Sequence, residues 1–166
     1  ASPQSAGKPY QEAVSGRWPA ETRERRGWLM DTPIPEAIKN LTVMAVEEDL
    51  EKIASAVDVV FSALDMEKEK IKEVEIAYAS REVAVISNNS AHRWTPDVPM
   101  IMPEVNPGHA ELIDIQRKHR GWKRGLIAVK PNCSIQSYVP PLHALAEFGP
   151  EKVIVSTYKA ISGAGK

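Results

Sequence analysis

The chain has 166 residues, a net charge of −1 and 26% charged residues, a balance that gives no electrostatic reason to expect nucleic acid or an acidic membrane surface as a partner. Its length suits one ordinary domain or parts of two. Its single cysteine cannot form an internal disulfide, and it shows neither a secretory signal pattern nor an apolar run near the ~20 residues that span a bilayer, so we expect a cytoplasmic protein.

The first stretch in chain order is loop-like. Residues 1–10 are rich in Ser, Gly and Pro, and we expect neither a strand nor a helix there. Residues 16–31 interleave arginines with Trp18 and Trp28, a mixture that can stack on and neutralise nucleic acid. However, Glu21, Glu24 and Asp31 offset most of that charge. We therefore expect an exposed loop packed under its two tryptophans.

From residue 40 onward, strand-like and helix-like patterns alternate. We expect strands at residues 41–46, 57–63, 82–86, 125–129 and 152–158, and helices at 47–55, 66–80, 110–119 and 135–148. The 57–63 strand is apolar at nearly every position, which is typical of parallel strands covered on both faces. The charge run of the 66–80 helix indicates a solvated face with i,i+4 pairs. The alternation predicts an α/β fold with a doubly wound parallel sheet.

Two loops of this predicted sheet are candidates for ligand binding. In such sheets, ligands bind beyond the carboxyl ends of the strands. The loops in question are residues 62–65 (S-A-L-D) and 87–94 (S-N-N-S-A-H-R-W), and both are rich in small and polar residues. Prolines, including Pro140 and Pro141, are interpreted as loop and turn residues.

The only cysteine, Cys133, lies at a predicted junction between a strand and a helix. A helix N-terminus presents unpaired N–H groups and the positive end of the helix dipole, both of which favour a thiolate over a thiol. Asn132 and Ser134 are suitable cap residues, and Pro131 keeps Lys130 extended, which fixes where the strand ends. Cys133 is therefore a candidate nucleophile. The alternative is a buried structural cysteine.

Taken together, these segments resemble the aspartate-β-semialdehyde dehydrogenase family. The match rests on P-N-C-S (131–134), which follows S-A-G-K-P-Y (5–10), F-S-A-L-D (61–65), S-N-N-S-A-H-R-W (87–94) and D-V-P-M-I-M-P-E-V-N-P (97–107), and precedes S-T-Y-K-A-I-S-G-A-G (156–165). The resemblance covers nearly the whole chain except residues 17–30. It favours this family over the N-acetylglutamyl-phosphate reductases, whose cysteine motif has Gly where this chain has Asn132.

The resemblance implies a Rossmann-like cofactor domain and an enzyme of lysine, methionine and threonine biosynthesis. Its reaction would be the reversible, NADP- and phosphate-dependent oxidation of L-aspartate 4-semialdehyde to 4-phospho-L-aspartate. In the family the cysteine, here Cys133, attacks the aldehyde, a hydride passes to NADP, and phosphate cleaves the resulting thioester. No metal is implied, and the family suggests a homodimer or homotetramer.

Several positions match residues that have roles in the family. Asn132 matches the Asn beside the nucleophile, and Arg93 matches an Arg that helps to hold phosphate, with a plain surface arginine as the alternative. The implied cofactor-binding positions are Ser2, Ser5, Ala6, Gly7, Ser62, Ala63, Leu64, Ser87, Asn88, Gly163 and Gly165, and Lys159 would contact the substrate. The four histidines, His92, His109, His119 and His143, do not match the catalytic base, so we expect them to be structural or exposed.

The chain departs from the family pattern in three ways. Lys159 stands where most members have Gln, and Gln4 stands where Arg is common, which leaves the choice between NADP and NAD open. Family members are much longer, with a strand and a Gly-rich turn before the matched region, and a substrate-binding Arg and a catalytic His after it. We therefore expect residues 1–132 to be a partial NADP-binding domain and residues 133–166 to begin a catalytic and dimerisation domain. We expect the 166 residues alone to be inactive.

Two other functions stay open. A malonyl-CoA reductase would use the same cysteine on a CoA thioester, although Asn132 and the S-I-Q after Cys133 fit that branch less well. A non-catalytic fragment could instead bind a partner through the face left by a missing domain. An exposed apolar patch with self-association would support that function.

Overall fold

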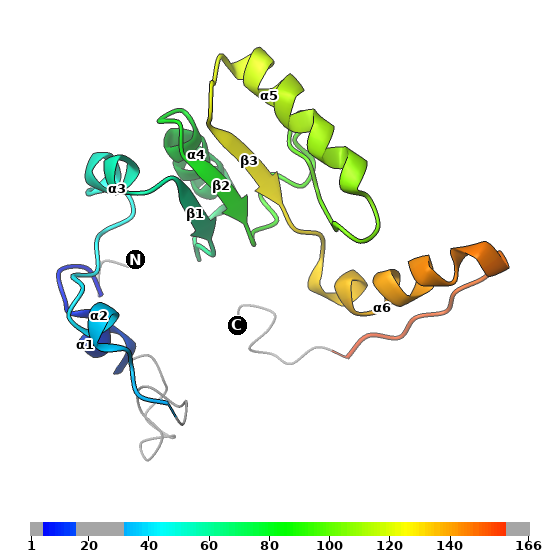
Figure 1. The fold of residues 1–166 in the computed structure, drawn as a ribbon, viewed down its shortest axis with the longest axis horizontal. Coiled ribbons are helices and arrows are strands. Elements are labelled where there is room, and N and C mark those ends of the chain that lie inside the picture. The colour runs from blue at the N-terminus through cyan, green and yellow to red at the C-terminus, as the bar shows by residue number, and fades with distance from the viewer. Residues whose placement is uncertain (1–4, 16–31, 159–166) are drawn as a thin grey trace. The chain divides into compact units, whose positions relative to one another are not determined.

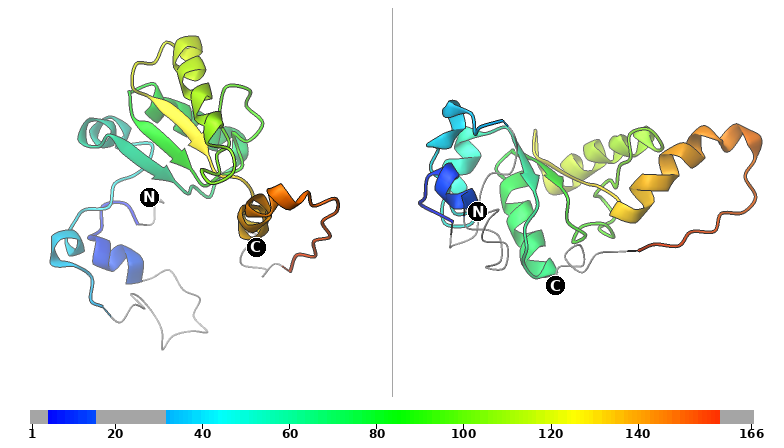
Figure 2. Two further views of the ribbon diagram at one scale, coloured as in Figure 1. Left: turned by 45° about the vertical axis from the view of Figure 1, so that its right-hand side comes forward. Right: turned by 90° about the horizontal axis from the view of Figure 1, so that it is seen from below.

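The computed structural model describes residues 5–15 and 32–158 (Figures 1 and 2). By their internal contacts the residues fall into two compact units, Ala1–Asp58 and Val59–Lys166. The expected Arg- and Trp-rich loop at residues 16–31 lies outside the described residues. No helix of the described part of the chain is long and apolar enough to cross a membrane.

The described part of the Ala1–Asp58 unit contains three short helices, α1 (Tyr10–Ser15), α2 (Glu36–Lys39) and α3 (Leu50–Ala56). The strand expected at residues 41–46 is wrong: Thr42 forms only an isolated antiparallel bridge with Pro9. The backbone N–H of Gly7 donates to the Val43 carbonyl at 2.8 Å, but this short pairing does not extend into a ladder. The predicted helix begins three residues late, because residues 46–49 form a turn in which the Asp49 carboxylate accepts the Ala45 N–H at 2.8 Å.

The Val59–Lys166 unit is built on a parallel sheet in the order β1 (Val59–Ser62), β2 (Ala84–Ser87), β3 (Leu126–Val129). The helices of this unit are α4 (Lys68–Ala79), α5 (Leu112–Arg120) with the short η2 (Pro107–Glu111) before it, and α6 (Cys133–Ala144) with η3 (Ala146–Phe148) after it (Figure 1). The α/β class and the parallel sheet are confirmed, with every strand shorter than predicted. The strand expected at residues 152–158 is wrong, because those residues are exposed and form no ladder with any described segment.

The core lies between α4 and the sheet. Helix α4 contacts β2 and β3, and its apolar stripe of Ile71, Val74 and Tyr78 is at most 5% exposed. On the sheet, Val85 and Ile127 sit opposite each other in register and are 1% and 0% exposed. Burying such side chains stabilises the fold by about 1.5–3 kcal/mol each.

The two edges of the sheet differ. The outer edge of β3 is covered, because the Gln116 amide of α5 accepts the Ile127 N–H at 2.8 Å and donates to the Ile127 carbonyl at 3.1 Å. Farther along, Val129 exchanges backbone bonds with Pro99 and Ile101. At the opposite edge, the expectation that the 57–63 strand is covered on both faces is wrong for the described residues: Val59 and Phe61 are 47% and 83% exposed.

Pro140 and Pro141 lie inside α6 and not in a turn, which corrects the sequence-based interpretation. Neither proline can donate the backbone bond that would go to residue i−4. Helix α6 therefore lacks the two bonds that these positions would otherwise make to the carbonyls of Gln136 and Ser137.

Candidate active site at the carboxyl ends of the strands

Cys133 is the first residue of α6 and follows directly on the segment that leaves β3. Its thiol is exposed, so the alternative of a buried structural cysteine is wrong. Asn132 caps the helix as predicted: its side-chain oxygen accepts the Ser134 N–H at 2.8 Å. The predicted junction of strand and helix is confirmed, and it presents the thiol at the carboxyl end of the sheet.

The backbone immediately before Cys133 is fixed from both sides. Arg93, which is half-buried, donates from Nε to the Lys130 carbonyl at 3.2 Å and from Nη2 to the Pro131 carbonyl at 3.3 Å. Gln136 of α6 also donates to the Pro131 carbonyl, at 2.9 Å. The structure therefore brings Arg93 beside the Cys133 segment, and Arg93 is not a plain surface arginine.

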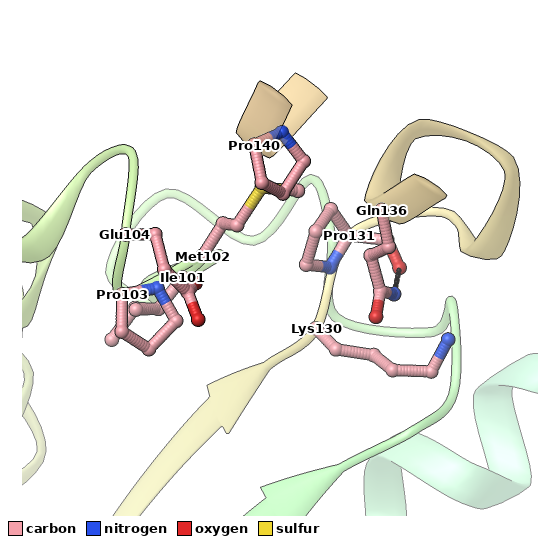
Figure 3. Close-up of a pocket in the computed structure, with 8 residues that line it drawn as sticks. All are labelled: Ile101, Met102, Pro103, Glu104, Lys130, Pro131, Gln136 and Pro140. Atoms are coloured by element: carbon pink, nitrogen blue, oxygen red, sulfur yellow. Dashed lines mark hydrogen bonds between the residues drawn. The ribbon is translucent and has the colours of Figure 1, made fainter. Parts of the chain in front are cut away.

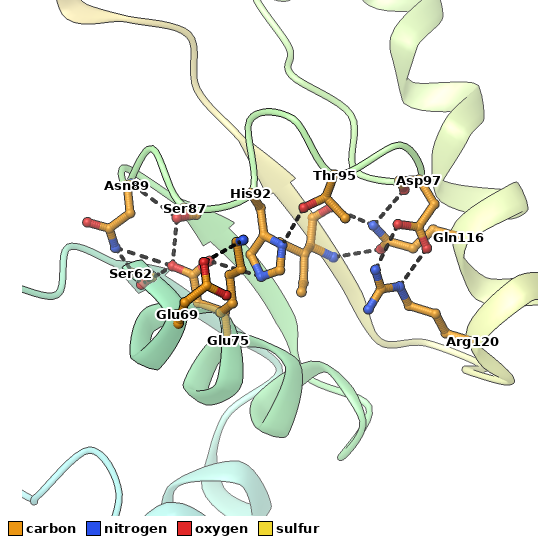
Figure 4. Close-up of polar contacts among 12 residues, drawn as sticks. Ser62, Glu69, Glu75, Ser87, Asn89, His92, Thr95, Asp97, Gln116 and Arg120 are labelled. Carbon is orange, nitrogen blue, oxygen red and sulfur yellow. Dashed lines mark hydrogen bonds and ion pairs between the residues drawn. The ribbon is translucent and has the colours of Figure 1, made fainter. Parts of the chain in front are cut away.

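The ends of β1 and β2 meet beside this segment. Ser62 and Ser87 pair in register, and the Asn88 N–H donates to the Ser62 carbonyl at 2.8 Å. Both serine side chains are buried, and their hydroxyls donate to Glu75 of α4 at 2.5 and 2.6 Å (Figure 4). Among the predicted cofactor positions at this edge, Ala63 and Asn88 are exposed and Leu64 is half-buried.

The remaining predicted site residues belong to the other unit or are not among the described residues. Ser5, Ala6 and Gly7 belong to the Ala1–Asp58 unit, whereas Cys133 belongs to the other unit. They form a turn in which Gly7 has φ +80°, a backbone conformation that suits glycine. Ser2, Lys159, Gly163 and Gly165 lie outside the described residues.

A pocket of about 340 Å³ is lined by residues that precede and follow Cys133 in the sequence, although Cys133 itself is not among them (Figure 3). Its walls come from the 101–104 segment, the end of the β3 segment and α6. The lining residues are Ile101, Met102, Pro103, Glu104, Lys130, Pro131, Gln136 and Pro140. The lining therefore includes one positive and one negative residue, Lys130 and Glu104, among residues that are mostly apolar. Among the described residues, no cluster of His, Cys, Asp and Glu could hold a metal ion.

The histidines lie where the sequence interpretation put them. His92 is 1% exposed, and its burial lowers the pKa of its imidazole, partly opposed by the nearby Glu75. His109, His119 and His143 are exposed. His119 contacts Asp97, whose pKa falls to about 2, mainly because Arg120 donates two hydrogen bonds to its carboxylate.

The sequence interpretation missed Glu75 and Gln116, which are 1% and 0% exposed. A signal for Glu75 was present: it stands four residues after Ile71 and one after Val74, on the apolar stripe of α4. A charged residue at a core position of a helix must have polar partners nearby. The flanking charges Glu69, Lys70, Lys72 and Glu73 do form exposed pairs, at i,i+3 spacing.

The chain is similar in sequence to a family model and to several known enzymes. The family model described as "Semialdehyde dehydrogenase, NAD binding domain" matches residues 1–113. The aspartate-semialdehyde dehydrogenase of Methanothermobacter thermautotrophicus is 38% identical over 166 residues, which cover 99% of this chain and 42% of that protein. The malonyl CoA reductase (NADP) of Metallosphaera sedula is 37% identical over 162 residues, covering 97% of this chain and 40% of that protein.

The structure also resembles a solved one. The crystal structure of aspartate semialdehyde dehydrogenase with NADP from Candida albicans superposes with a TM-score of 0.66 and 30% identity, covering 90% of this chain and 39% of that one. The chain thus spans about two fifths of the length of the relatives that it matches.

Proposed function

The chain belongs to the semialdehyde dehydrogenase family, whose NAD-binding domain matches residues 1–113, and from this premise we propose that it forms part of an NADP-dependent aspartate-semialdehyde dehydrogenase. The proposed reaction is the reversible, phosphate-dependent oxidation of L-aspartate 4-semialdehyde to 4-phospho-L-aspartate, on the route to lysine, methionine and threonine. One observation carries the proposal: an exposed cysteine begins a capped helix at the carboxyl end of the sheet, beside an arginine. The 38% identity to a protein of that name supports it.

In this proposal Cys133 is the nucleophile. The thiolate sulfur forms a bond to the aldehyde carbon, and the carbonyl oxygen takes up the electron pair. Bound NADP would supply the hydride acceptor for this carbon; the electron pair on the oxygen would return to re-form the carbonyl, which leaves an acyl thioester on Cys133. A phosphate oxygen then attacks the thioester carbon, the C–S bond breaks with its electron pair on sulfur, and 4-phospho-L-aspartate leaves.

Arg93 and Asn132 have side-chain donors suited to this chemistry. Arg93 uses two of its N–H groups on the Lys130 and Pro131 carbonyls, so the rest of its guanidinium can meet a phosphate. Asn132 uses its side-chain oxygen to cap α6, which leaves its amide N–H groups for the oxygen of the reacting carbonyl. Both assignments are proposals drawn from the family resemblance and from these contacts.

The residues at the carboxyl ends of β1 and β2 fit a dinucleotide. The loops after the strands carry small or exposed residues, Ala63 and Asn88, so a flat ligand could approach the backbone closely. Ser62, Leu64 and Ser87 would complete that edge. For Ser5, Ala6 and Gly7, the family resemblance implies a role at the 2′-phosphate. Residues 1–132 would then be the cofactor-binding part, and residues 133–166 would begin the part that completes catalysis and forms a homodimer or homotetramer.

A second candidate is malonyl-CoA reduction, favoured by the 37% identity to a protein of that name. It would use Cys133 in the same way, but on a CoA thioester and without phosphate. A third candidate, a non-catalytic module that binds a partner, is favoured by the exposure of Phe61 and Val59 on the sheet.

The natural full-length protein and its Cys133→Ser variant distinguish these candidates. We expect the wild type to form NADPH from aspartate semialdehyde and NADP⁺ only when phosphate is present. It should be inactive with malonyl-CoA and NADPH. The variant should lose at least about a thousandfold in kcat, because a serine hydroxyl is a far weaker nucleophile at neutral pH, while its NADP affinity and unfolding midpoint stay unchanged. Phosphate-independent turnover of malonyl-CoA would favour the second candidate, and a wild type inactive on both substrates would contradict both enzyme functions.

A further inference from the structure

Glu75 connects both strand ends of the candidate cofactor edge through one buried oxygen. Its Oε1 atom accepts the Ser62 hydroxyl at 2.5 Å, the Ser87 hydroxyl at 2.6 Å and the Asn89 side-chain amide at 3.2 Å (Figure 4). Ser62 ends β1, Ser87 ends β2, and Asn89 lies in the loop that follows β2. We call these four residues, Ser62, Glu75, Ser87 and Asn89, the Glu75 network.

Asn89 orients the two hydroxyls within this network. Its side-chain amide donates to Ser62 Oγ at 3.1 Å, and its backbone N–H donates to Ser87 Oγ at 3.1 Å. Because both hydroxyl oxygens accept bonds from Asn89, their protons are directed at Glu75. The network therefore has one arrangement, in which a single oxygen sets the relative positions of the ends of β1 and β2.

The second carboxyl oxygen of Glu75, Oε2, indicates that a contribution to stability does not by itself explain why a glutamate stands at this position. Glu75 Oε2 and His92 Nε2 lie 3.9 Å apart, both side chains are 1% exposed, and neither atom has a hydrogen-bond partner among the described residues. His92 contacts Thr95 through its other nitrogen, at 3.0 Å. An unpaired buried polar atom lowers the free energy of unfolding. A neutral side chain of the same shape at position 75 would avoid the free-energy cost of burying a carboxyl group.

We propose that Glu75 is a positioning residue for NADP binding, which it controls by holding the backbone at Ser62 and Ser87 in the arrangement that the dinucleotide requires. The inference rests on the proposed function, since Ser62, Ala63, Ser87 and Asn88 form the proposed cofactor edge. Glu75 lies behind the sheet ends in α4, and it acts through the two serines and Asn89 without touching the ligand itself.

The test is Glu75→Gln in the natural full-length protein, with Glu73→Gln as a matched control. Glu73 is on the same helix, but its side chain is 71% exposed and lies 3.6 Å from Lys70. Gln keeps the volume of Glu75 and one acceptor oxygen for the network, but it lacks the carboxylate charge, so the hydrogen bonds from Ser62, Ser87 and Asn89 are weakened. We expect the Kd for NADP⁺ to rise about tenfold in E75Q, with the midpoint of urea unfolding nearly unchanged, and neither quantity to change in E73Q. A merely structural glutamate would lower the midpoint and leave the Kd of the folded fraction unchanged.

A milder variant, Ser87→Ala, covers the case in which E75Q does not fold. It removes one donor, and we expect it to weaken NADP⁺ binding. Where E75Q folds, combining the two changes should add little further loss, because both break the same contact. An unchanged Kd for NADP⁺ in E75Q, or in S87A where E75Q does not fold, would overturn this inference but not the proposed function. Failure of the wild type to bind NADP⁺ would overturn the proposed function, and the inference with it.

Discussion

Asp97 shows how one side chain can join a loop to a helix. It precedes the segment that pairs with β3, and its carboxylate accepts two hydrogen bonds from Arg120 of α5, at 2.6 and 2.7 Å (Figure 4). Its backbone carbonyl accepts from Gln116, on the same helix, at 2.8 Å. The Asp97 side chain is only 12% exposed, so these bonds are screened less than those of a surface pair.

Replacing Asp97 with Asn should lower the free energy of unfolding at pH 7 by about 2 kcal/mol. Because Arg120 lowers the pKa of Asp97 from 3.8 to about 2 in the folded state, this contribution is complete above about pH 5 and is lost as the pH falls toward 2. The difference between wild type and D97N should therefore shrink between pH 5 and pH 2 in urea unfolding.

The exposed Asp114 provides the control for this measurement. Its side chain is 88% exposed and lies 3.8 Å from Arg117 on the same helix. Asp114→Asn should change the free energy of unfolding by less than about 0.5 kcal/mol at any pH in this range. A wild-type advantage over D97N that persists at pH 2 would contradict the role given to the carboxylate.

At the scale of elements, the entry to β3 depends on a close approach to the end of α4. A Cβ atom on Gly125 would lie 1.9 Å from the Ala79 carbonyl oxygen and 3.0 Å from its carbon, both backbone atoms. Glu82, with φ +66°, accepts the N–H groups of Arg124, Gly125 and Lys123 through its carboxylate. These bonds, led by the one from Arg124, lower the pKa of Glu82.

Gly125→Ala should therefore be strongly destabilising, by about 2–4 kcal/mol, because backbone atoms of α4 and β3 must move apart. Gly108→Ala is the matched control: no atom lies within 4 Å of its Cβ position, and its φ is not in the left-handed region. We expect that variant to change the free energy of unfolding by less than about 0.5 kcal/mol. Equal stability of the two variants by urea unfolding would contradict the packing at this junction.

Local patterns predicted the elements whose partners lie nearby in the sequence. Helix α4, strand β2 and the Asn132 cap depend on periodicity, a continuous apolar run and a short-range bond, so they were predicted correctly. The strand expected at residues 152–158 has the same β-branched composition, but a strand forms only where a second strand supplies its hydrogen bonds. The Glu75 network could not be predicted, because it joins residues 12 and 13 positions away from Glu75 through tertiary packing.

At the scale of the whole Val59–Lys166 unit, the sheet is protected unevenly. Strand β2 is paired on both edges, and the outer edge of β3 is covered by Gln116 and by the 99–101 segment. Strand β1 is paired with β2 alone among the described strands, and its Phe61 is 83% exposed. Amides open most readily where few buried contacts and paired edges hold them.

Hydrogen exchange read by mass spectrometry should therefore rank the three strands. We expect peptides covering β2 and β3 to exchange at least about tenfold more slowly than those covering β1, a difference of ~1.4 kcal/mol in opening free energy. The reason is that Val85 and Ile127 are almost fully buried, whereas β1 pairs with β2 alone among the described strands and has an exposed face. Protection of β1 equal to that of β2 in the full-length protein would mean that another segment or a second copy covers Phe61. Equal protection in the 166 residues alone that persists on dilution would contradict the uneven protection of the sheet itself.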